Sequence, residues 1–466
     1  MEKKKHTRES WGSNFGFLMA AVGSAVGLGN MWGFPYKIGM NGGFVFLLLY
    51  LILVVFTGYT MVMTELAIGR TTGQSIILAY RKLSKKYTII GVFGALAPFL
   101  ILGFYSYLGG YCIKYAVSNF GDIFGAKWGV SGVAGPQYFE KLMLDRPQSA
   151  IYTAIFLLLT ILIVSKGVAG GIEKFNKFAM PGLVVMLFIV IIRSVTLPGA
   201  SAGLAFLFKP DFSVFKGTGW ITVLAAAGGQ MFFSLSLGMG IMVTYGSYMS
   251  KEQSIEKNAF IIPIADTLIA LMASLAIMPA VFASGQDPAG GVGLLYMTLQ
   301  TVFNNMGTLG PIFGTIFYFL VFIAAITSSI SVLEAIISSF IDISLNKGKG
   351  HARVKWALVF GALTLIEGLL ISFDGLGTYF PKFFGKFCWL DGFDLVSEGL
   401  LMPIGAFMTS IFFGWIDREI LPKEIGESSE FKTKNFYRFC IKWLAPIFTF
   451  FILLGQINTF FGLGWF

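Results

Sequence analysis

The hydrophobic residues of this chain lie in long runs separated by short polar segments. A run of about 18 or more apolar residues is long enough to cross a bilayer as a helix. We count eleven such runs, at approximately 14–36, 43–69, 88–118, 149–165, 177–196, 220–249, 258–284, 309–343, 355–372, 394–416 and 440–462. The pattern therefore predicts an all-α membrane protein with eleven transmembrane helices.

Two of these runs carry glycine and hydroxyl residues at their centres, at 24–30 and 234–240. A helix that is interrupted there leaves peptide N–H and C=O groups free at mid-depth, where lipid offers no hydrogen-bond partner. Broken helices at matching positions of two halves are typical of the central binding site of a secondary transporter. We therefore expect spans 1–5 and 6–10 to form a 5+5 inverted repeat with broken helices 1 and 6, followed by an eleventh helix.

This division predicts four parts of the chain. They are a cytoplasmic N-terminal segment at 1–9, a first five-helix repeat at 10–200, a second repeat at 201–416, and a loop with the eleventh helix at 417–466. The polar stretch 284–308 is interpreted either as a short amphipathic lid or as a plain connecting loop.

Charge changes the picture in one respect, because it predicts an orientation. Charged residues make up only 12% of the chain, against about 25% in globular proteins. Most of the 34 Lys and Arg residues fall in segments that lie on one side of the membrane if the N-terminus is cytoplasmic. By the positive-inside rule we expect a multi-pass protein of the cell membrane, with the C-terminus outside. The net charge of +10 then reflects basic loops that face anionic lipid headgroups, and no nucleic-acid partner is expected.

The sequence offers little for catalysis. The three cysteines show no paired spacing, and both histidines, His6 and His351, fall in segments outside the predicted spans. We therefore expect no enzyme, no organic cofactor and no histidine-based site inside the membrane. An ion channel remains the alternative to a secondary transporter.

Ordered motifs in spans 1, 2, 6 and 8 resemble the neurotransmitter:sodium symporters, over essentially all of residues 8–416. The motifs are Arg8-Glu9-Ser10-Trp11, the stretch 23–30 leading to Phe34-Pro35-Tyr36, Asn41-Gly42-Gly43, Glu65-Leu66-Ala67-Ile68-Gly69-Arg70, the stretch 230–238, and Thr327-Ser328-Ser329. Ending after an eleventh span resembles the shorter bacterial members, which are sodium-driven amino-acid transporters. The resemblance implies a symporter that imports a neutral L-amino acid by alternating access, and a transporter for another small zwitterion or amine is the alternative.

The resemblance also implies a substrate site. Amides of Leu28 and Gly29 and the Tyr105 hydroxyl would hold the substrate carboxylate, which agrees with the affinity of free helix N–H groups for anions. Carbonyls near Ala25, Phe233 and Ser236 would receive the ammonium group. The other implied lining residues are Ile101, Gly238, Met239, Ser328 and Val332. Because Ile101, Met239 and Val332 are apolar and methionine adapts its shape, we predict a hydrophobic or aromatic substrate. A packed Tyr105 with a satisfied hydroxyl is the structural alternative.

Two sodium sites are implied in the same way. The first would comprise Ala25, Asn30, Ser234, Asp266 and an oxygen of the substrate carboxylate. The second would comprise the carbonyls of Gly23, Val26 and Ala324 and the hydroxyls of Thr327 and Ser328. The alternative for these hydroxyls is hydrogen bonding to carbonyls of their own helix, which is common in membrane helices.

Asp266 stands alone among the implied ligands as an acid inside a span, and such a residue is a functional candidate by default. In animal members of the family the matching residue is asparagine, and a nearby chloride ion supplies the negative charge. Some bacterial members carry a glutamate one helical turn further on, where this chain has Ala270. We therefore expect Asp266 to replace chloride. Proton uptake by Asp266 after sodium release, with proton antiport, is a second hypothesis.

The resemblance implies gates on both sides of the site. On the inner side Arg8 would pair with Asp342, near Trp11 and Tyr248. On the outer side the rings of Tyr105 and Phe233 would cover the substrate. Many members carry an arginine before Phe-Pro, where this chain has Gly33, so Lys37 is the candidate to pair with Asp394, although it lacks the fork geometry of arginine. Gly171 and Pro181 resemble an element that unwinds in the inner pathway, and an ordinary kinked helix start is the alternative.

Overall fold

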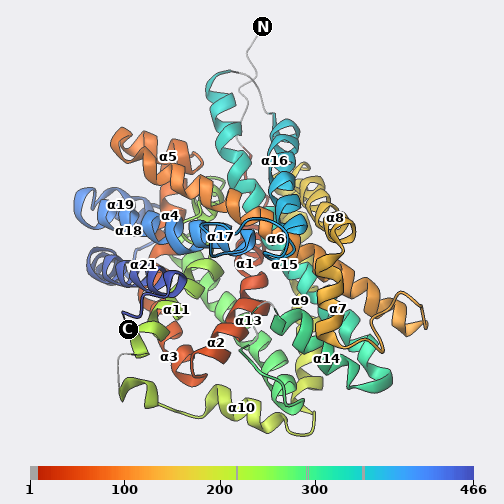
Figure 1. Ribbon diagram of the computed structural model, residues 1–466. Helices are drawn as coiled ribbons and strands as arrows, with labels where there is room; N and C mark the ends of the chain where they lie inside the picture. The colour runs from red at the N-terminus through yellow and green to blue at the C-terminus, as the bar shows by residue number, and fades with distance from the viewer. Residues whose placement is uncertain (1–8, 217–218, 290, 292, 349–351, 466) are drawn as a thin grey trace.

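The computed structural model describes residues 9–216, 219–289, 291, 293–348 and 352–465, and this part of the chain is helical apart from loops and one isolated bridge between Phe383 and Phe387 (Figure 1). The longer helices are α1 (Asn14–Ala25), α3 (Phe44–Leu53), α4 (Tyr59–Thr72), α6 (Thr88–Ile123), α8 (Arg146–Val164), α9 (Lys174–Val195), α11 (Gly219–Ser234), α13 (Ile255–Ala283), α15 (Gly310–Asn346), α16 (Arg353–Asp374), α18 (Met402–Ile411) and α21 (Ala445–Phe461). The shorter ones are α2 (Phe34–Met40), α5 (Ile76–Leu83), α7 (Gly135–Leu144), α10 (Ala200–Phe208), α12 (Ile241–Gly246), α14 (Leu299–Asn304), α17 (Trp389–Asp394), α19 (Ile420–Glu427) and α20 (Lys434–Phe439).

Three π-helical segments join two helices into one span. Val54–Gly58 joins α3 to α4, Leu395–Leu401 joins α17 to α18, and Cys440–Leu444 joins α20 to α21. The other π-helical segments begin or end a single helix, and they are Gly29–Gly33, Val168–Glu173, Leu294–Thr298 and Phe412–Ile416. A π turn inside an α-helix is a local deformation that often lies at functional sites.

Nine helical stretches among the described residues are long and apolar enough to cross a membrane. A bent pair, Asn14–Ala25 and Gly29–Met40, makes a tenth with an angle of 46° between its halves. The predicted sixth span consists of α11 and α12, separated by residues 235–240. Each of the eleven predicted runs therefore has a helical counterpart, and both predicted breaks are present.

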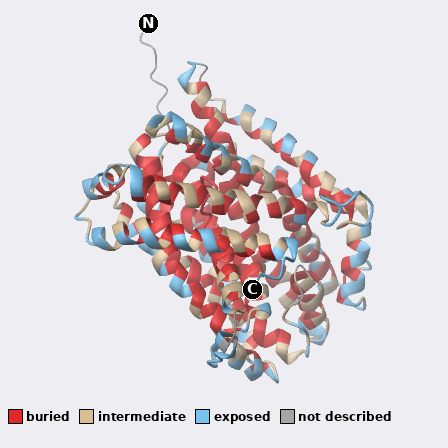
Figure 2. Ribbon diagram, turned by 60° about the vertical axis from the view of Figure 1, so that its left-hand side comes forward, coloured by how far each residue is buried: buried red, intermediate tan, exposed pale blue. Residues whose placement is uncertain are grey.

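The interior of the bundle is built around α15. Most residues of its most apolar stretch are buried, and the helix packs along α6, α9 and α1. Figure 2 shows the buried residues concentrated in the middle of the bundle and the exposed residues along its periphery. Helix α15 therefore forms the backing against which the broken first span is held.

The outer faces of the peripheral helices are apolar. On α8 and α9 large hydrophobic side chains are more than half exposed, among them Ile151, Leu158, Val185, Phe188 and Ile192. A soluble protein would rarely expose an apolar surface of this extent. The surface fits contact with lipid acyl chains.

Candidate functional site

The break in the sixth span follows from residues that favour a left-handed backbone. Ser236, Gly238 and Gly240 all have positive φ, at 54°, 76° and 70°, and glycine adopts that conformation without steric cost. The freed N–H of Gly238 donates to Glu65 Oε1 on α4 at 2.7 Å. Glu65 therefore satisfies a backbone group that the break exposes, a role that the sequence motif alone did not reveal.

The break in the first span lies against α6 and α15. A Cβ atom on Gly27 would collide with Ser328 Oγ and the Tyr105 hydroxyl, so only glycine permits this approach. The N–H of Leu28 donates to the Tyr105 hydroxyl at 2.9 Å. Two groups predicted to hold the substrate carboxylate therefore lie side by side and, in this structure, bond to each other.

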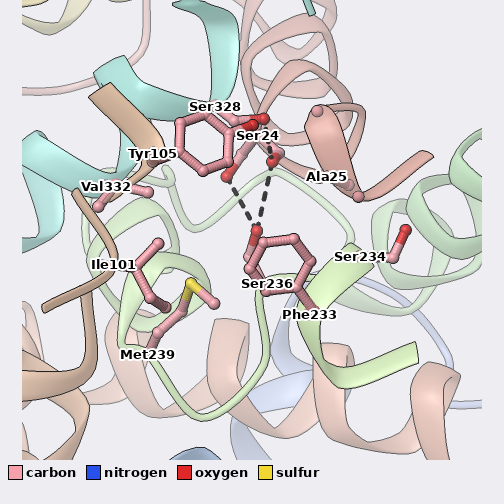
Figure 3. A pocket seen from close by; sticks show the side chains of 12 residues that line it. Ser24, Ala25, Ile101, Tyr105, Phe233, Ser234, Ser236, Met239, Ser328 and Val332 are labelled. Carbon is pink, nitrogen blue, oxygen red and sulfur yellow. Dashed lines mark hydrogen bonds between the residues drawn. The ribbon is translucent and has the colours of Figure 1, made fainter. Parts of the chain in front are cut away.

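A cavity lies between the two breaks (Figure 3). Its volume is about 20 Å³, close to the size of one water molecule. Hydroxyl groups gather on one side, where Ser236 contacts Ser24. The side chains of Ile101 and Met239 lie together away from these hydroxyls. The lining residues are Ser24, Ala25, Gly27, Gly29, Ile101, Tyr105, Phe233, Ser234, Ser236, Met239, Ser328 and Val332.

The predicted substrate residues are therefore brought together. All of them line the cavity except Leu28 and Gly238, which lie in the two breaks next to it. Because the cavity is so small, the structure shows a contracted form of the site. A bound amino acid would require the side chains around it to move apart.

Asp266 on α13 is fully buried and receives hydrogen bonds from three sides. Asn30 Nδ2 donates to Oδ1 at 2.7 Å, and Ser234 Oγ lies 2.9 Å from both carboxylate oxygens. The Tyr50 hydroxyl donates to Oδ2 at 3.2 Å. Three of the implied first-site sodium ligands thus converge, and a carboxylate with neutral oxygen groups suits a hard cation.

Two neighbours of this cluster were not predicted as site residues. Tyr50 lies in an ordinary apolar run, and nothing in its sequence surroundings marks it. Gln230 belongs to the span 6 motif, but its role emerges only here, because Nε2 donates to the carbonyl of Gly29 at 2.8 Å. Gln230 thereby ties α11 to the first break.

The implied second sodium site is also assembled. Thr327 Oγ1 lies 2.9 Å from the carbonyl of Ala324 and 3.5 Å from that of Val26. Ser328 Oγ lies 2.9 Å from the carbonyl of Ser24 and 3.3 Å from that of Gly23. The alternative is realised for Thr327, which bonds to the carbonyls of Ile323 and Ala324 on its own helix. Ser328 instead crosses to α1, so the two neutral hydroxyls lie next to the carbonyls of Gly23, Ser24, Val26 and Ala324.

The predicted inner-gate pair of Arg8 and Asp342 stays a prediction, and the structure describes only part of the gate. Arg8 lies outside the described residues. Asp342 accepts hydrogen bonds from the backbone N–H and the hydroxyl of Ser75, at 2.7 and 2.6 Å. Trp11 does lie beside Tyr248, with ring centroids 6.1 Å apart, and its indole N–H donates to the carbonyl of Tyr245. The two rings therefore lie close together as expected, and their role as a gate stays a prediction.

A buried ion network next to Trp11 was missed by the sequence analysis. Arg353 pairs with Glu334 and with Glu9, and the Tyr248 hydroxyl donates to Glu334 at 2.7 Å. The Glu334 side chain is not exposed at all. An acid in the middle of an apolar span should have drawn attention to Glu334, whereas Arg353 looked like one of many basic residues at a span boundary. The network ties the N-terminal segment to α15 and α16.

On the opposite face, Lys37 forms an ion pair, but not with Asp394. Its Nζ lies 2.9 Å from Glu398 Oε1. Glu398 follows Asp394 by four residues in the same helical stretch, so both project from one face, and the longer glutamate side chain reaches the lysine. The predicted partner is therefore corrected from Asp394 to Glu398.

The segment between Gly171 and Pro181 is helical in this structure. A π turn at Val168–Glu173 leads directly into α9, and Pro181 lies inside that helix. Glu173 accepts hydrogen bonds from the N–H of Gly12 at 2.7 Å and from Ser13. The structure thus shows the wound form, held against the N-terminal segment, and unwinding stays a prediction.

Comparisons with known proteins agree with this geometry. The profile of the Sodium:neurotransmitter symporter family matches residues 8–131 and 144–465. An uncharacterized sodium-dependent transporter, YhdH, of Bacillus subtilis is 34% identical over 462 residues, which cover 96% of this chain and 97% of that protein. An uncharacterized sodium-dependent transporter of Haemophilus influenzae is 32% identical over 98% of this chain and 100% of its own length.

A solved structure shares the whole fold. The crystal structure of MhsT in complex with L-phenylalanine superposes with a TM-score of 0.86 at 35% identity, over 97% of this chain and 100% of that one. The predicted eleven-helix class with a broken first helix is thereby confirmed. The chain belongs to the sodium:neurotransmitter symporter family, and it is a multi-pass, sodium-dependent membrane transporter and not an enzyme.

Proposed function

We propose that the chain imports a neutral, hydrophobic or aromatic L-amino acid together with sodium, by alternating access. The observation that carries this proposal is the cavity between the two helix breaks. One side offers N–H and hydroxyl groups for a carboxylate and an ammonium, and the other offers only apolar side chains. The match to MhsT, whose structure holds L-phenylalanine, supports the same substrate class.

Two sodium ions would couple to the substrate in different ways. The first, held by Ala25, Asn30, Ser234 and Asp266, would share an oxygen of the substrate carboxylate, so that each favours binding of the other. For Asn30 to present its oxygen to this ion, its side-chain amide would rotate by half a turn, because Oδ1 now accepts a hydrogen bond from the N–H of Gly27. The second ion would hold the broken first helix against α15. The negative charge of Asp266 would replace chloride, and after sodium leaves Asp266 would take up a proton and carry it outward on the return step.

Alternating access would open and close the contacts that cover the site on the inner and the outer side of the membrane. With the N-terminus cytoplasmic, the Arg353–Glu334–Tyr248 network and the Trp11 contacts close the inner side. Opening would require the N-terminal segment to leave Glu173 and Arg353, which also frees the Gly171–Pro181 segment to unwind. On the outer side, the ring of Phe233 and the Lys37–Glu398 pair would separate to admit substrate.

Competition in proteoliposomes tests the substrate class. Uptake of radiolabelled L-phenylalanine is driven by a sodium gradient while each of the other amino acids is added in excess. We expect Leu, Met, Tyr and Trp to compete best, because the apolar side of the cavity has no charge to match Asp, Glu, Lys or Arg. Uptake that does not saturate would indicate a channel. Selective competition by glutamate or lysine, or by an amine without a carboxylate, would contradict the proposal.

Met239 sets the size of the side-chain pocket. It lies in the break between two glycines and is 2% exposed, and its flexible thioether can move to admit a large substrate. Met239→Phe should therefore weaken inhibition by Trp and Phe at least about tenfold relative to inhibition by Val, a difference of ~1.4 kcal/mol. Met40→Phe, at an exposed position, is the matched control. Equal inhibition profiles in both variants would place Met239 outside the pocket.

A further inference from the structure

Glu367 is a buried acid inside the ninth span, on α16, and it is 7% exposed. Both of its carboxylate oxygens are buried and have no hydrogen-bond partner in the described chain. Other acids buried in the spans, such as Asp266 and Glu334, have close partners. Neither sodium site includes Glu367, and it does not line the substrate cavity. An acid inside an apolar span is expensive and is a functional candidate for that reason.

The carboxyl group of Glu367 packs against the backbone of α6. A Cβ atom on Gly103 would lie only 2.4 Å from Glu367 Cδ, so the two helices are in close contact here. Ile101 and Tyr105, two residues before and two residues after Gly103, line the substrate cavity. Residues two apart on a helix do not share a face. Glu367 therefore lies on the opposite side of α6 from the substrate cavity, at a similar depth in the membrane.

A row of polar side chains leads from this contact along α16 and α6. Asp374, two turns beyond Glu367 on the same helix face, is fully buried, and its Oδ1 has no hydrogen-bond partner in the described chain. Tyr107, one turn beyond Gly103, lies close enough to Asp374 to interact electrostatically, and its hydroxyl donates to that of Tyr111 at 2.9 Å. The Tyr111 hydroxyl lies 3.3 Å from Ser149 Oγ on α8. Acids and hydroxyl groups in such a row are typical of a proton relay. On the orientation proposed above, the row leads towards the outer side.

No charged group in the described chain offsets a negative charge on Glu367. The helices packed against α16 are α6, α8, α15 and α17. In their stretches around this contact the titratable side chains are those of Tyr105 and Tyr107 on α6, Tyr152 on α8, Tyr318 and Glu334 on α15, and Asp391 and Asp394 on α17. None of these groups acts electrostatically on Glu367. Because an isolated buried carboxylate is costly, these surroundings favour the neutral acid.

We propose that Glu367 is a proton-binding site that exchanges its proton with the outer side along this row, and that the protonated form holds α6 in place behind the substrate cavity. Release passes the proton to water at the outer surface and leaves a buried carboxylate against the backbone of Gly103. That carboxylate has no donor, so α6 shifts and carries Ile101 and Tyr105 with it, which weakens substrate binding. This proton is distinct from the one proposed for Asp266, which belongs to the sodium cluster.

Infrared spectroscopy tests for the proton on the purified full-length protein, without substrate or a sodium gradient, so this result does not depend on the transport proposal. The difference between the spectra of the wild type and Glu367→Gln at neutral pH should contain the C=O stretching band of a protonated carboxyl group. The band should disappear as the pH rises into the alkaline range. Glu140→Gln removes an exposed acid on α7 and should give no such band. Absence of the band for Glu367→Gln at neutral pH would overturn the proposal.

A chemical label replaces the variant if Glu367→Gln does not fold. Dicyclohexylcarbodiimide reacts with protonated carboxyl groups in apolar surroundings, and the labelled peptide is identified by mass spectrometry. In the wild type Glu367 should be labelled at neutral pH, whereas Glu334, which is paired with Arg353, should not. A wild type in which Glu367 stays unlabelled would then contradict the proton site.

Uptake of L-phenylalanine connects the proton to the substrate cavity, and this measurement rests on the proposed function. As the external pH rises from neutral into the alkaline range, the KM of the wild type should rise at least about threefold, because only the protonated fraction binds substrate well. Glu367→Gln resembles the neutral acid and should keep a low KM, whereas Glu140→Gln should follow the wild type. Tyr107→Phe interrupts the row and should delay the response to a sudden change of external pH.

The two measurements fail separately. If no protein variant takes up L-phenylalanine, the proposed function is wrong and the infrared band still decides the proton site. If the KM rises equally in the wild type and in Glu367→Gln, the proposed effect of the proton on α6 is refuted.

Discussion

Asp266→Asn is expected to reduce sodium-driven uptake to background in chloride-free medium. Asp266 is the buried carboxylate on which Asn30, Ser234 and Tyr50 converge. Two unit charges about 4 Å apart attract each other by ~4 kcal/mol at an effective dielectric constant of about 20. Removing the negative charge should therefore weaken sodium binding at the first site at least about a hundredfold, since ~1.4 kcal/mol corresponds to tenfold. Uptake of L-phenylalanine in gluconate medium measures the loss.

The same experiment tests whether the wild type needs chloride. Replacing external chloride by gluconate should leave wild-type uptake unchanged, and a loss of most uptake would refute the role of Asp266. Asp266→Asn/Ala270→Glu returns an acid one helical turn further along α13 and should recover part of the uptake. Asp287→Asn, in the loop after α13, controls for the amide substitution itself. Wild-type uptake in Asp266→Asn would leave Asp266 as a neutral structural acid.

Thr327→Ala and Ser328→Ala are expected to raise the sodium concentration for half-maximal uptake, each by about tenfold or more. Each change removes one neutral oxygen from the point where α15 meets the broken first span. Because the change does not alter charge, saturating sodium should restore part of the uptake. Sodium titration of the initial uptake rate measures both effects.

Thr315 offers a matched control on the same helix. Its hydroxyl bonds to the carbonyl of Pro311 at 2.7 Å, away from the site, so Thr315→Ala should leave the sodium dependence unchanged. Thr327→Ser, which keeps a hydroxyl, should need nearly the same sodium concentration for half-maximal uptake as the wild type. If sodium dependence is unchanged in both Thr327→Ala and Ser328→Ala, the second ion binds elsewhere or does not exist.

Whether a polar contact of the site could be predicted from the sequence depends on how far apart its two residues lie in the chain. Thr327 and Ser328 are neighbours on one helix, and their hydroxyls could be placed on the same helical stretch without a structure. The partner of Asp266 on α3, Tyr50, could not, because a tyrosine in an apolar run is usually a packed aromatic. Only the packing of α3 beside α11, with the Tyr50 side chain reaching α13, brings its hydroxyl to the carboxylate.

The sequence is also insufficient to predict which charged residues form ion pairs. The resemblance pointed to Asp394 for Lys37, yet Glu398 in the same helical stretch takes the lysine. Two acids one turn apart share a helix face, so sequence spacing does not decide between them. The choice depends on side-chain length and on the relative height of two helices, which are properties of the packed bundle.

The sequence by itself determined the membrane class, the eleven apolar runs and the two breaks. The runs are local features, since a run must be apolar to enter lipid, and the breaks were indicated by glycine with hydroxyl residues at matching positions of two spans. The same residue types also lie inside the unbroken helices α6 and α15. Tertiary structure decided which groups meet at the breaks, such as Gln230 with Gly29 and Glu65 with Gly238, and which charges pair away from them, such as Arg353 with Glu334. Inside a membrane a freed polar group must find a partner in the protein, and which partner it finds depends on segments far apart in the chain.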